Sequence, residues 1–235
     1  MNHEKNTINE QLFLDNYDPK AFAPMAVTVD VVVFGIKKRT SGNYRKLDIQ
    51  DLNILLIKRD DYPYKDYYSL PGGFVKQDET IDQAATRVLK GKTGLNNIYC
   101  EQLYTFGDVD RDPRMRIISC AYIALIDANT AKINDAEWFS IDEIPSLQLA
   151  FDHNNITCEA LKRLRGKINY TDIVFHMMPK RFTISELQEV YEIILGEKLI
   201  PAAFRRFISD KIQETDELTK NAGHRPSRIY EYIRR

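Results

Sequence analysis

The sequence predicts an α/β sandwich followed by a winged helix-turn-helix. Up to about residue 167, β-branched apolar runs alternate with helical patterns, as in sheets covered by helices. Beyond that point, two short helical patterns and a strand-like segment follow within about sixty residues. Hydrophobic residues make up 43% of the chain and charged residues 29%, which is typical of a globular protein. We expect three units: an N-terminal arm (1–24), the sandwich (25–167) and the winged helix (168–235).

The sandwich should begin with two paired strands. Residues 27–36 (VTVDVVVFGI) are β-branched and apolar, which predicts a buried strand. The run NILLIKR (53–59) is its expected partner, and the polar segment 39–51 between them suggests an extended hairpin. Residues 1–24 are polar with scattered aromatics and should form an arm or a short helix.

The glycine turn LPGGF (70–74) leads through a polar loop to a helix expected over residues 81–93. Apolar residues at helical spacing, including Ala84, Ala85 and Leu89, place one face of that helix on the core. The remaining elements expected in the sandwich are strands at 99–106, 117–126 and 136–139, a short helical step at 140–145 and a helix at 151–167.

The second unit opens with a capping box, in which Thr183 caps a helix and Glu186 reaches back. Gly196 should end that helix, and Pro201 should start the next one. A polar turn and an alternating strand at 229–233 then suggest a basic hairpin, so this unit is predicted to be a winged helix-turn-helix. The residues expected to face inward from the second helix are Phe204, Phe207, Ile208 and Ile212.

The stretch 70–95, LPGGFVKQDETIDQAATRVLKGKTGL, resembles a Nudix box without its metal-binding acids. Gly73, Glu79 and Arg87 keep their places, but the positions of three helix glutamates are different. Carboxylates spaced three and four apart would share one helix face and bind Mg²⁺. A valine and a glycine offer no side-chain oxygen, and a lysine brings a positive charge instead, so hydrolysis by the usual Nudix mechanism is not expected. The replacing residues are Val88, Gly91 and Lys92.

Across nearly its full length, the chain resembles the NrtR family of Nudix-related transcriptional regulators. The motifs that carry this resemblance are LPGGFV (70–75), FGDVDRDPR (106–114), AEWFSIDEIP (136–145), LAFDH (149–153), PKRFTISELQEVYEIILG (179–196), AFRRF (203–207) and GHRPSRIY (223–230). The resemblance implies an effector-binding Nudix-like domain at 25–167 and a DNA-binding winged-helix domain at 168–235. It also implies a repressor that binds a two-fold symmetric operator as a homodimer. The effector would be ADP-ribose or a related NAD metabolite, although similar regulators sense sugars such as arabinose.

The effector pocket implied by the resemblance has five candidate residues. The planar guanidinium group of an arginine can bind two phosphate oxygens at once, and an aromatic ring can pack on adenine or on a sugar. The tyrosines at 62, 64, 67 and 68 are alternatives for that packing role. The segment 110–113 could equally be a salt-bridged turn with no ligand role. The candidates are Arg59, Phe74, Arg111, Asp112 and Arg114.

DNA contacts are expected from the second unit. Residues 201–235 carry eight Lys and Arg against five Asp and Glu, although the whole chain has a net charge of −1. Arg205 and Arg206 should lie near the start of the recognition helix, where such helices meet base edges or phosphates. Two arginines on an exposed face can also be merely solvated. Four further residues complete the predicted interface: Thr183 and Ser185 on the first helix, and Arg225 and Arg228 on the wing.

Two rival functions remain open from the sequence. One is a Mg²⁺-dependent Nudix pyrophosphatase acting on ADP-ribose or nucleoside diphosphates, in which Glu79 would be assisted by Asp78, Asp82, Glu101 or Asp110. The other is a binding module that recruits protein through its winged helix. We expect no cofactor and no metal site unless hydrolase activity remains. The polar N-terminus resembles no signal peptide, and no apolar run is long enough to span a membrane, so a cytoplasmic protein is expected.

Overall fold

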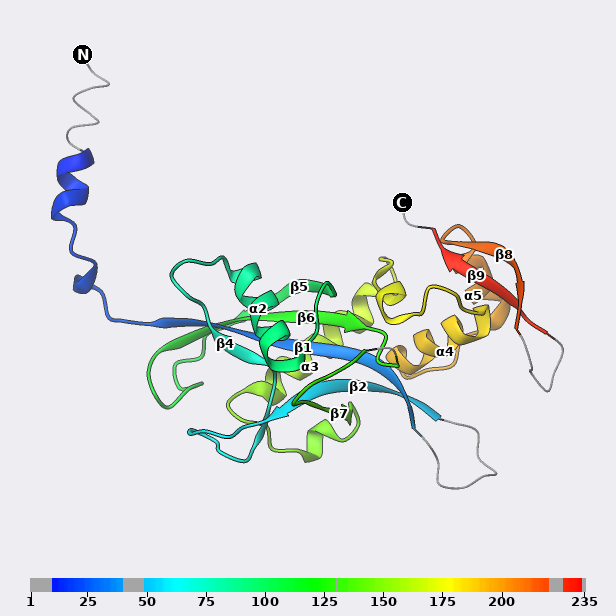
Figure 1. The fold of residues 1–235 in the computed structure, drawn as a ribbon, viewed down its shortest axis with the longest axis horizontal. Helices are drawn as coiled ribbons and strands as arrows, with labels where there is room; N and C mark the ends of the chain where they lie inside the picture. The colour runs from blue at the N-terminus through cyan, green and yellow to red at the C-terminus, as the bar shows by residue number, and fades with distance from the viewer. Residues whose placement is uncertain (1–9, 40–48, 130, 220–225, 234–235) are drawn as a thin grey trace, which may run out of the picture.

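The computed structural model describes residues 10–39, 49–129, 131–219 and 226–233 (Figure 1). Its centre is a seven-stranded mixed sheet with helices α2 and α3 on its two faces. A second, two-stranded sheet lies at the end of the molecule away from the N-terminal arm (Figure 1). The strands are β1 (Ala26–Arg39), β2 (Ile49–Lys58), β3 (Tyr68–Ser69), β4 (Gly72–Phe74), β5 (Tyr99–Phe106), β6 (Ile117–Ile126), β7 (Glu137–Ser140), β8 (Ile212–Leu218) and β9 (Arg228–Tyr232). The helices are α2 (Ile81–Thr93), α3 (His153–Lys167), α4 (Ile184–Leu195) and α5 (Pro201–Ile208), with 3-10 turns at Pro19–Ala21, Ile144–Ser146 and Ile173–Met177.

Strand β1 divides the core of the sandwich into two layers. Its alternate residues Val29, Val31 and Val33 pack with α2, whereas Val32 and Phe34 pack in the cluster that contains α3. Successive side chains of a strand point to opposite faces, so a continuous apolar run is what a strand covered on both sides requires. The α/β sandwich predicted from this run is confirmed.

The order of the main sheet, β3-β2-β1-β6-β5, brings β4 against the start of β1. β1 runs antiparallel to β2 and parallel to β6, while β4 pairs antiparallel with β1 and sets Gly72 opposite Asp30. A Cβ atom on Gly72 would lie 2.1 Å from the Asp30 carboxylate. The glycine turn is therefore needed because the backbone of β4 closely approaches a buried acid.

Helix α2 has the predicted bounds, and both of its ends have a local cause. The Thr80 side chain accepts a hydrogen bond from the Gln83 backbone N–H, and the Gln83 side chain accepts one from the Thr80 N–H. At the other end, Gly94 adopts a left-handed conformation with a φ of 76°. These two signals fix where the helix starts and ends, and the apolar residues Ala84, Ala85 and Leu89 define the face that reaches the core.

A single hydrophobic cluster continues from the sandwich into the second unit. It contains Leu164 and Ile168 around the end of α3 together with Leu187, Val190 and Ile194 of α4. The two units are thus packed on each other rather than joined by an extended linker. The boundary between residues 167 and 168 stays a prediction.

The winged helix-turn-helix is present, but the end of α5 and the strand β8 differ from the elements predicted from the sequence. The capping box of α4 forms as predicted, with Thr183 and Glu186 bonded reciprocally, and Gly196 ends the helix. However, α5 ends at Ile208, so Ile212 begins a strand instead of continuing the helical stripe. Phe207, expected inside, is 38% exposed. The segment read as a polar turn is β8, which pairs with β9, and Phe182 adds a bridge to β9 at Tyr230.

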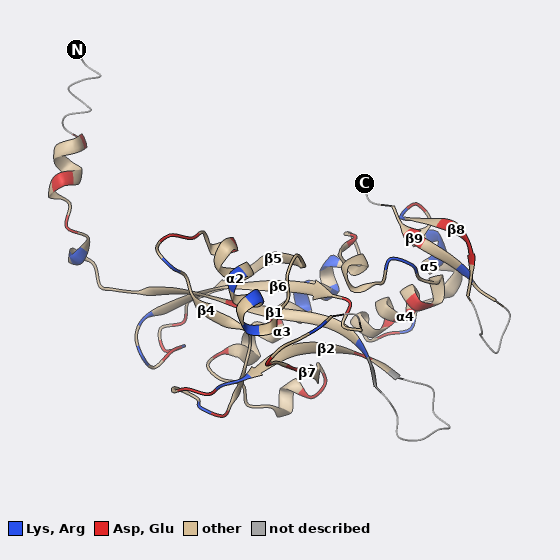
Figure 2. Cartoon of the chain, in the orientation of Figure 1, with Lys and Arg blue, Asp and Glu red and all other residues tan. Residues whose placement is uncertain are grey.

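The expected basic character of the hairpin is wrong for its described strands. β8 (IQETDEL) carries three acidic residues and no basic one, while α5 carries two arginines (Figure 2). The charged side chains of β8 alternate poorly with apolar ones, which is why the segment resembles a turn in sequence.

The N-terminal arm stands away from the body (Figure 1). Its described part is helical at residues 10–16 and forms a 3-10 turn at Pro19–Ala21. This agrees with the sequence prediction of an arm or a short helix. The backbone first joins the sheet where the Ala26 N–H donates to the Arg116 carbonyl at 3.1 Å. Among the described residues, no helix combines the length and apolarity that a membrane span requires.

Candidate functional site

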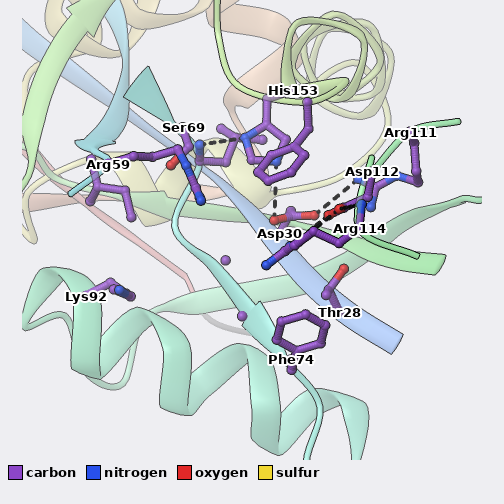
Figure 3. A pocket seen from close by; sticks show the side chains of 15 residues that line it. Thr28, Asp30, Arg59, Ser69, Phe74, Lys92, Arg111, Asp112, Arg114 and His153 are labelled. Carbon is purple, nitrogen blue, oxygen red and sulfur yellow. Dashed lines mark hydrogen bonds and ion pairs between the residues drawn. The ribbon is translucent and has the colours of Figure 1, made fainter. Parts of the chain in front are cut away.

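A cavity of about 290 Å³ lies where β4, the end of β2 and the start of α3 meet beside α2 (Figure 3). Three of the five predicted effector residues, Arg59, Phe74 and Arg114, have side chains at this cavity and retain exposed surface. Arg111 and Asp112 also line it but are buried. The sequence therefore predicted a set of residues that the fold gathers at one place. The full lining is Thr28, Asp30, Ile57, Arg59, Ser69, Leu70, Gly72, Gly73, Phe74, Lys92, Arg111, Asp112, Arg114, Phe151 and His153.

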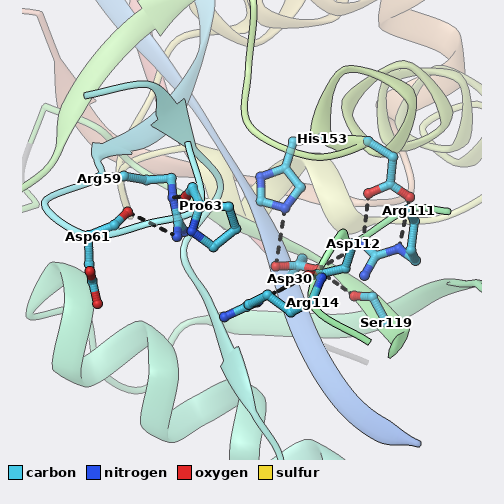
Figure 4. Close-up of polar contacts among 10 residues, drawn as sticks. Asp30, Arg59, Asp61, Pro63, Arg111, Asp112, Arg114, Ser119 and His153 are labelled. Carbon is cyan, nitrogen blue, oxygen red and sulfur yellow. Dashed lines mark hydrogen bonds and ion pairs between the residues drawn. The ribbon is translucent and has the colours of Figure 1, made fainter. Parts of the chain in front are cut away.

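A buried carboxylate, Asp30, organises the floor of the cavity (Figure 4). The Ser119 hydroxyl donates to its Oδ2 at 2.5 Å, and an Arg111 guanidinium nitrogen lies 3.5 Å from the same oxygen. His153 Nε2 lies 3.5 Å from Oδ1, and its Nδ1 accepts the Leu70 N–H at 3.0 Å. Burial by itself raises the pKa of Asp30, but the surrounding donors and positive charge outweigh it, and the net pKa is lowered. The floor is a fixed ionic cluster that positions the turn at Leu70.

Arg111 and Asp112 form the salt-bridged turn predicted as the alternative to a ligand role (Figure 4). Arg111 donates to both carboxylate oxygens of Asp152, at 2.9 and 2.7 Å, and is only 7% exposed. Asp112 accepts two hydrogen bonds from the Arg114 guanidinium, at 2.9 and 2.8 Å. These two residues shape the wall of the cavity, and their ligand role stays a prediction.

Two guanidinium groups stand over aromatic rings at the mouth of the cavity. Arg59 lies 4.9 Å from the Phe151 ring centre, and Arg114 lies 5.3 Å from that of Phe74 and 5.7 Å from that of Phe151. Partial burial, followed by the charge of Arg114, lowers the pKa of Arg59. Like charges held this close favour an anion between or beside them. None of the four candidate tyrosines lines the cavity; Tyr64 instead contacts Phe151, with ring centres 4.8 Å apart.

The retained Nudix positions have a structural role. The Arg87 guanidinium donates to both oxygens of Glu79, at 2.8 and 2.6 Å, and to the Phe74 carbonyl at 2.8 Å. Glu79 also accepts the Lys76 N–H at 2.8 Å. The hydrogen bonds from Arg87 and then from Lys76 lower the pKa of Glu79 to about 2. This pair fastens the polar loop to α2 and so holds Phe74 at the cavity.

The candidate DNA-binding residues fall into three groups. Arg205 and Arg206 are exposed on α5 and have no hydrogen bond or ion pair from their side chains within the described part of the chain. The expectation that they lie near the start of this helix is wrong, because α5 is short and both fall in its last turn. Arg228 on β9 forms an ion pair with Glu214 of β8. Arg225 lies outside the described residues.

The two candidates on α4 differ in availability. Thr183 is buried, and its hydroxyl donates to the Glu186 carboxylate and accepts the Glu186 N–H. Ser185 is exposed in the first turn of α4. A role for either in phosphate contact remains a prediction.

Sequence reasoning missed several residues of the cavity. Asp30 lies within an apolar strand, and its role depends on contacts with Ser119 and His153 that are distant in sequence. Phe151 and His153 lie in LAFDH (149–153), a motif that carries the family resemblance but does not by itself indicate a cavity. An acid inside an otherwise apolar run was the available signal, because a buried carboxylate needs partners.

Comparisons with known proteins agree with this arrangement. Residues 27–160 match the sequence profile of the NUDIX domain, and residues 174–232 match that of the NrtR DNA-binding winged helix domain. Over 236 aligned residues, the chain is 38% identical to the ADPR responsive transcriptional repressor NtrR of Acinetobacter baylyi, covering 97% of this chain and 90% of that protein.

Two solved structures of a Shewanella oneidensis protein are also similar. NrtR complexed with a 27mer DNA superposes with a TM-score of 0.75 at 29% identity, covering 88% of this chain and 93% of that one. The NUDIX domain of the same protein, complexed with ADP ribose, gives a TM-score of 0.53 at 33% identity, covering 66% of this chain and 98% of that one.

Proposed function

Because this chain belongs to the NrtR family of Nudix-related transcriptional regulators, we propose that it is a transcriptional repressor responsive to ADP-ribose. Its winged helix binds operator DNA, and its Nudix-like part binds the effector without serving as a hydrolase. The observation that carries the effector role is the cationic, aromatic mouth of the cavity, where Arg59 and Arg114 stand over Phe151 and Phe74.

The chemistry of the cavity suits a dinucleotide-like anion. Guanidinium forks bind diphosphate oxygens, and the Phe74 ring, 45% exposed, offers a face for adenine or ribose. The relative from Acinetobacter baylyi is described as responsive to ADPR, and the Shewanella oneidensis NUDIX domain was solved with ADP ribose. Related NAD metabolites and pentoses are the competing effectors.

DNA binding is assigned to α5 and the hairpin. The exposed Arg205 and Arg206 give α5 two cations for phosphates or base edges. The complex of the Shewanella oneidensis protein with a 27mer DNA supports this assignment. We place the repressor in the cytoplasm, where a bacterial operator would be accessible.

A homodimer is the assembly that we propose. The described arm exposes large apolar side chains, and a second copy of the chain would cover them. A dimer would also present two winged helices to a two-fold symmetric operator. The exposed arm residues are Leu12, Phe13, Leu14, Tyr17, Phe22 and Met25.

Hydrolysis is not the function that the residues favour. Glu79 is engaged by Arg87 and the Lys76 backbone, and α2 carries no carboxylate at positions 88, 91 or 92. An assay for AMP released from ADP-ribose with Mg²⁺ should therefore show no turnover. Turnover that disappears in Glu79→Gln would make the chain an enzyme.

The decisive experiment is a mobility shift with promoter DNA of the chain's own operon. We expect a complex that weakens with increasing salt and dissociates on addition of ADP-ribose. A thermal shift screen with ADP-ribose, NAD, nicotinamide nucleotides and pentoses identifies the effector. Ligand at 100 times its dissociation constant should stabilise the protein by about 2.7 kcal/mol. A protein that ignores all such DNA at low salt is not this regulator.

A further inference from the structure

Helix α2 corresponds to the helix that binds a divalent cation in Nudix hydrolases, but its residues at the cation-binding positions differ in this chain. Hydrolytic members of the fold hold Mg²⁺ through carboxylates at the positions of Val88, Gly91 and Lys92. Val88 is 4% exposed, and its Cγ2 would lie 3.0 Å from a Cβ on Gly73, so it packs under the glycine turn. Gly91 has no side chain, and Lys92 is cationic. These residues do not fit a divalent cation, which needs several oxygen ligands. Among the described residues, no group of three or more His, Cys, Asp or Glu is placed to hold a metal.

Two of the cations lining the cavity form no ion pair with a carboxylate of the described residues. Arg111 and Arg114 are neutralised by Asp152 and Asp112. Arg59, by contrast, donates to the backbone carbonyls of Pro63 and Asp61, at 2.9 and 3.5 Å. Lys92 has no hydrogen bond or ion pair with any described residue, although its side chain lines the cavity. The cavity therefore retains positive charge that its own acids do not balance.

The two unbalanced cations share one side of the cavity. Figure 3 shows Lys92 on α2 and Arg59 beyond β2 on the same side, with Phe74 and Arg114 on the other. An elongated ligand whose ring packs at Phe74 would extend its anionic part towards Lys92 and Arg59.

We propose that the Lys92 ammonium takes the place of the divalent cation and neutralises the diphosphate of the effector. The proposal rests on the proposed response to ADP-ribose and adds how the diphosphate is held. Effector binding then needs no metal. A lysine is a compact point charge on a flexible stem, so it can reach phosphate oxygens from α2 without an ordered metal site.

Calorimetric titration of the full-length protein with ADP-ribose, in EDTA and in Mg²⁺, tests this proposal. The wild-type dissociation constant should be the same in both buffers. Lys92→Ala should weaken binding in EDTA by about tenfold, the value of one charge-assisted hydrogen bond. Lys92→Glu should weaken it further, whereas Lys92→Arg should restore most of it. The loss should shrink at high salt because the contact is partly exposed.

Lys90→Ala is the matched control, since Lys90 is exposed on the same helix turn but does not line the cavity. It should bind ADP-ribose as the wild type does. Wild-type binding that requires Mg²⁺, or a Lys92→Ala variant that binds like the Lys90→Ala control, would overturn the role of Lys92 and leave the regulator intact. A wild-type protein that binds no ADP-ribose in either buffer would instead overturn the proposed effector.

Discussion

Arg165 in the last turn of α3 donates a hydrogen bond from Nε to the backbone carbonyl of Ile194 at the end of α4, at 2.8 Å. The first residue of α3, His153, lies in the floor of the cavity, and Asp152 before it binds Arg111. One helix therefore contacts the candidate effector cavity at its start and the winged helix at its end. A displacement of α3 caused by ligand would be passed directly to α4.

Replacing Arg165 by alanine should loosen this connection. The α4 carbonyl loses its donor and the helix end loses a favourable positive charge, which together cost about 1 kcal/mol of the free energy of unfolding. ADP-ribose should bind with unchanged affinity, while more of it is needed to release DNA. Urea denaturation and a mobility shift titrated with ADP-ribose measure the two effects. Lys162→Ala, an exposed residue on the same helix, is the control, and equal behaviour of the two variants would contradict the coupling role.

The sequence predicts elements well where the signals are local. The bounds of α2 follow from Thr80 and Gly94, and the buried strand β1 follows from its β-branched run. β8 was not predicted because its residues are mostly polar and exposed, and its stability comes from pairing with β9, not from an apolar face. Ile212 was misassigned because its spacing from Ile208 also fits a helix.

The cavity was predicted only in part, for a different reason. The arginines and Phe74 could be selected by chemistry, since each is suited to an anionic or aromatic ligand. Whether Arg111 faces ligand or partner depends on Asp152, 41 residues away, and on Asp30 in β1. Such pairings arise from tertiary structure, and no local pattern of residues contains them.

The Glu79–Arg87 pair should make the free energy of unfolding depend on pH in the acidic range. The pKa of Glu79 is lowered from its usual 4.5 to about 2, so its contribution is complete above the higher value and lost as the pH falls towards the lower one. The difference in unfolding free energy between wild type and Glu79→Gln should therefore be largest near neutral pH and shrink between pH 4.5 and 2. Chemical denaturation across this range measures it. Asp142→Asn, an exposed acid, should leave the wild-type curve unchanged; a difference for Glu79→Gln that is independent of pH would contradict the pairing.

The arginines of α5 and the hairpin should contribute unequally to DNA binding. Arg205 and Arg206 are unpaired among the described residues, whereas Arg228 is held by Glu214. Arg205→Ala and Arg206→Ala should each weaken binding and lower the slope of log affinity against log salt by about 0.9 for every phosphate contact removed. Arg228→Ala should change the slope less. Fluorescence anisotropy at several salt concentrations gives the slopes.

A control for that series is Arg181→Ala, because Arg181 is bound to Glu217 and Glu231 of the hairpin. Its salt slope should match that of the wild type. If alanine at 205 and 206 leaves the slope unchanged while binding to another protein is lost, the winged helix is a protein-docking module instead.

The arm should be dispensable for the fold and needed for the dimer. The described hydrogen bonds of the arm are local, such as those from Gln11 to Asp15 and from Asn16 to the Leu12 carbonyl. When both proteins are measured at low concentration, a chain lacking residues 1–24 should therefore unfold at the same denaturant concentration as the full chain. The exposed rings of the arm, Phe13 at 64% and Phe22 at 63%, would nevertheless bury substantial apolar area on a partner copy, worth roughly 25 cal/mol per Å².

Light scattering after size exclusion should therefore report a dimer for the full chain and a monomer, or a weakened dimer, for the truncated one. Phe13→Asp with Phe22→Asp should act like the truncation, whereas Asp15→Asn, which leaves the apolar face of the arm intact, should not. Truncated protein that remains fully dimeric would show that the arm covers no dimer surface. Where truncation weakens the dimer, the DNA affinity of the truncated protein should fall to the same degree. A monomer has a single winged helix and can occupy only one half-site of a two-fold symmetric operator.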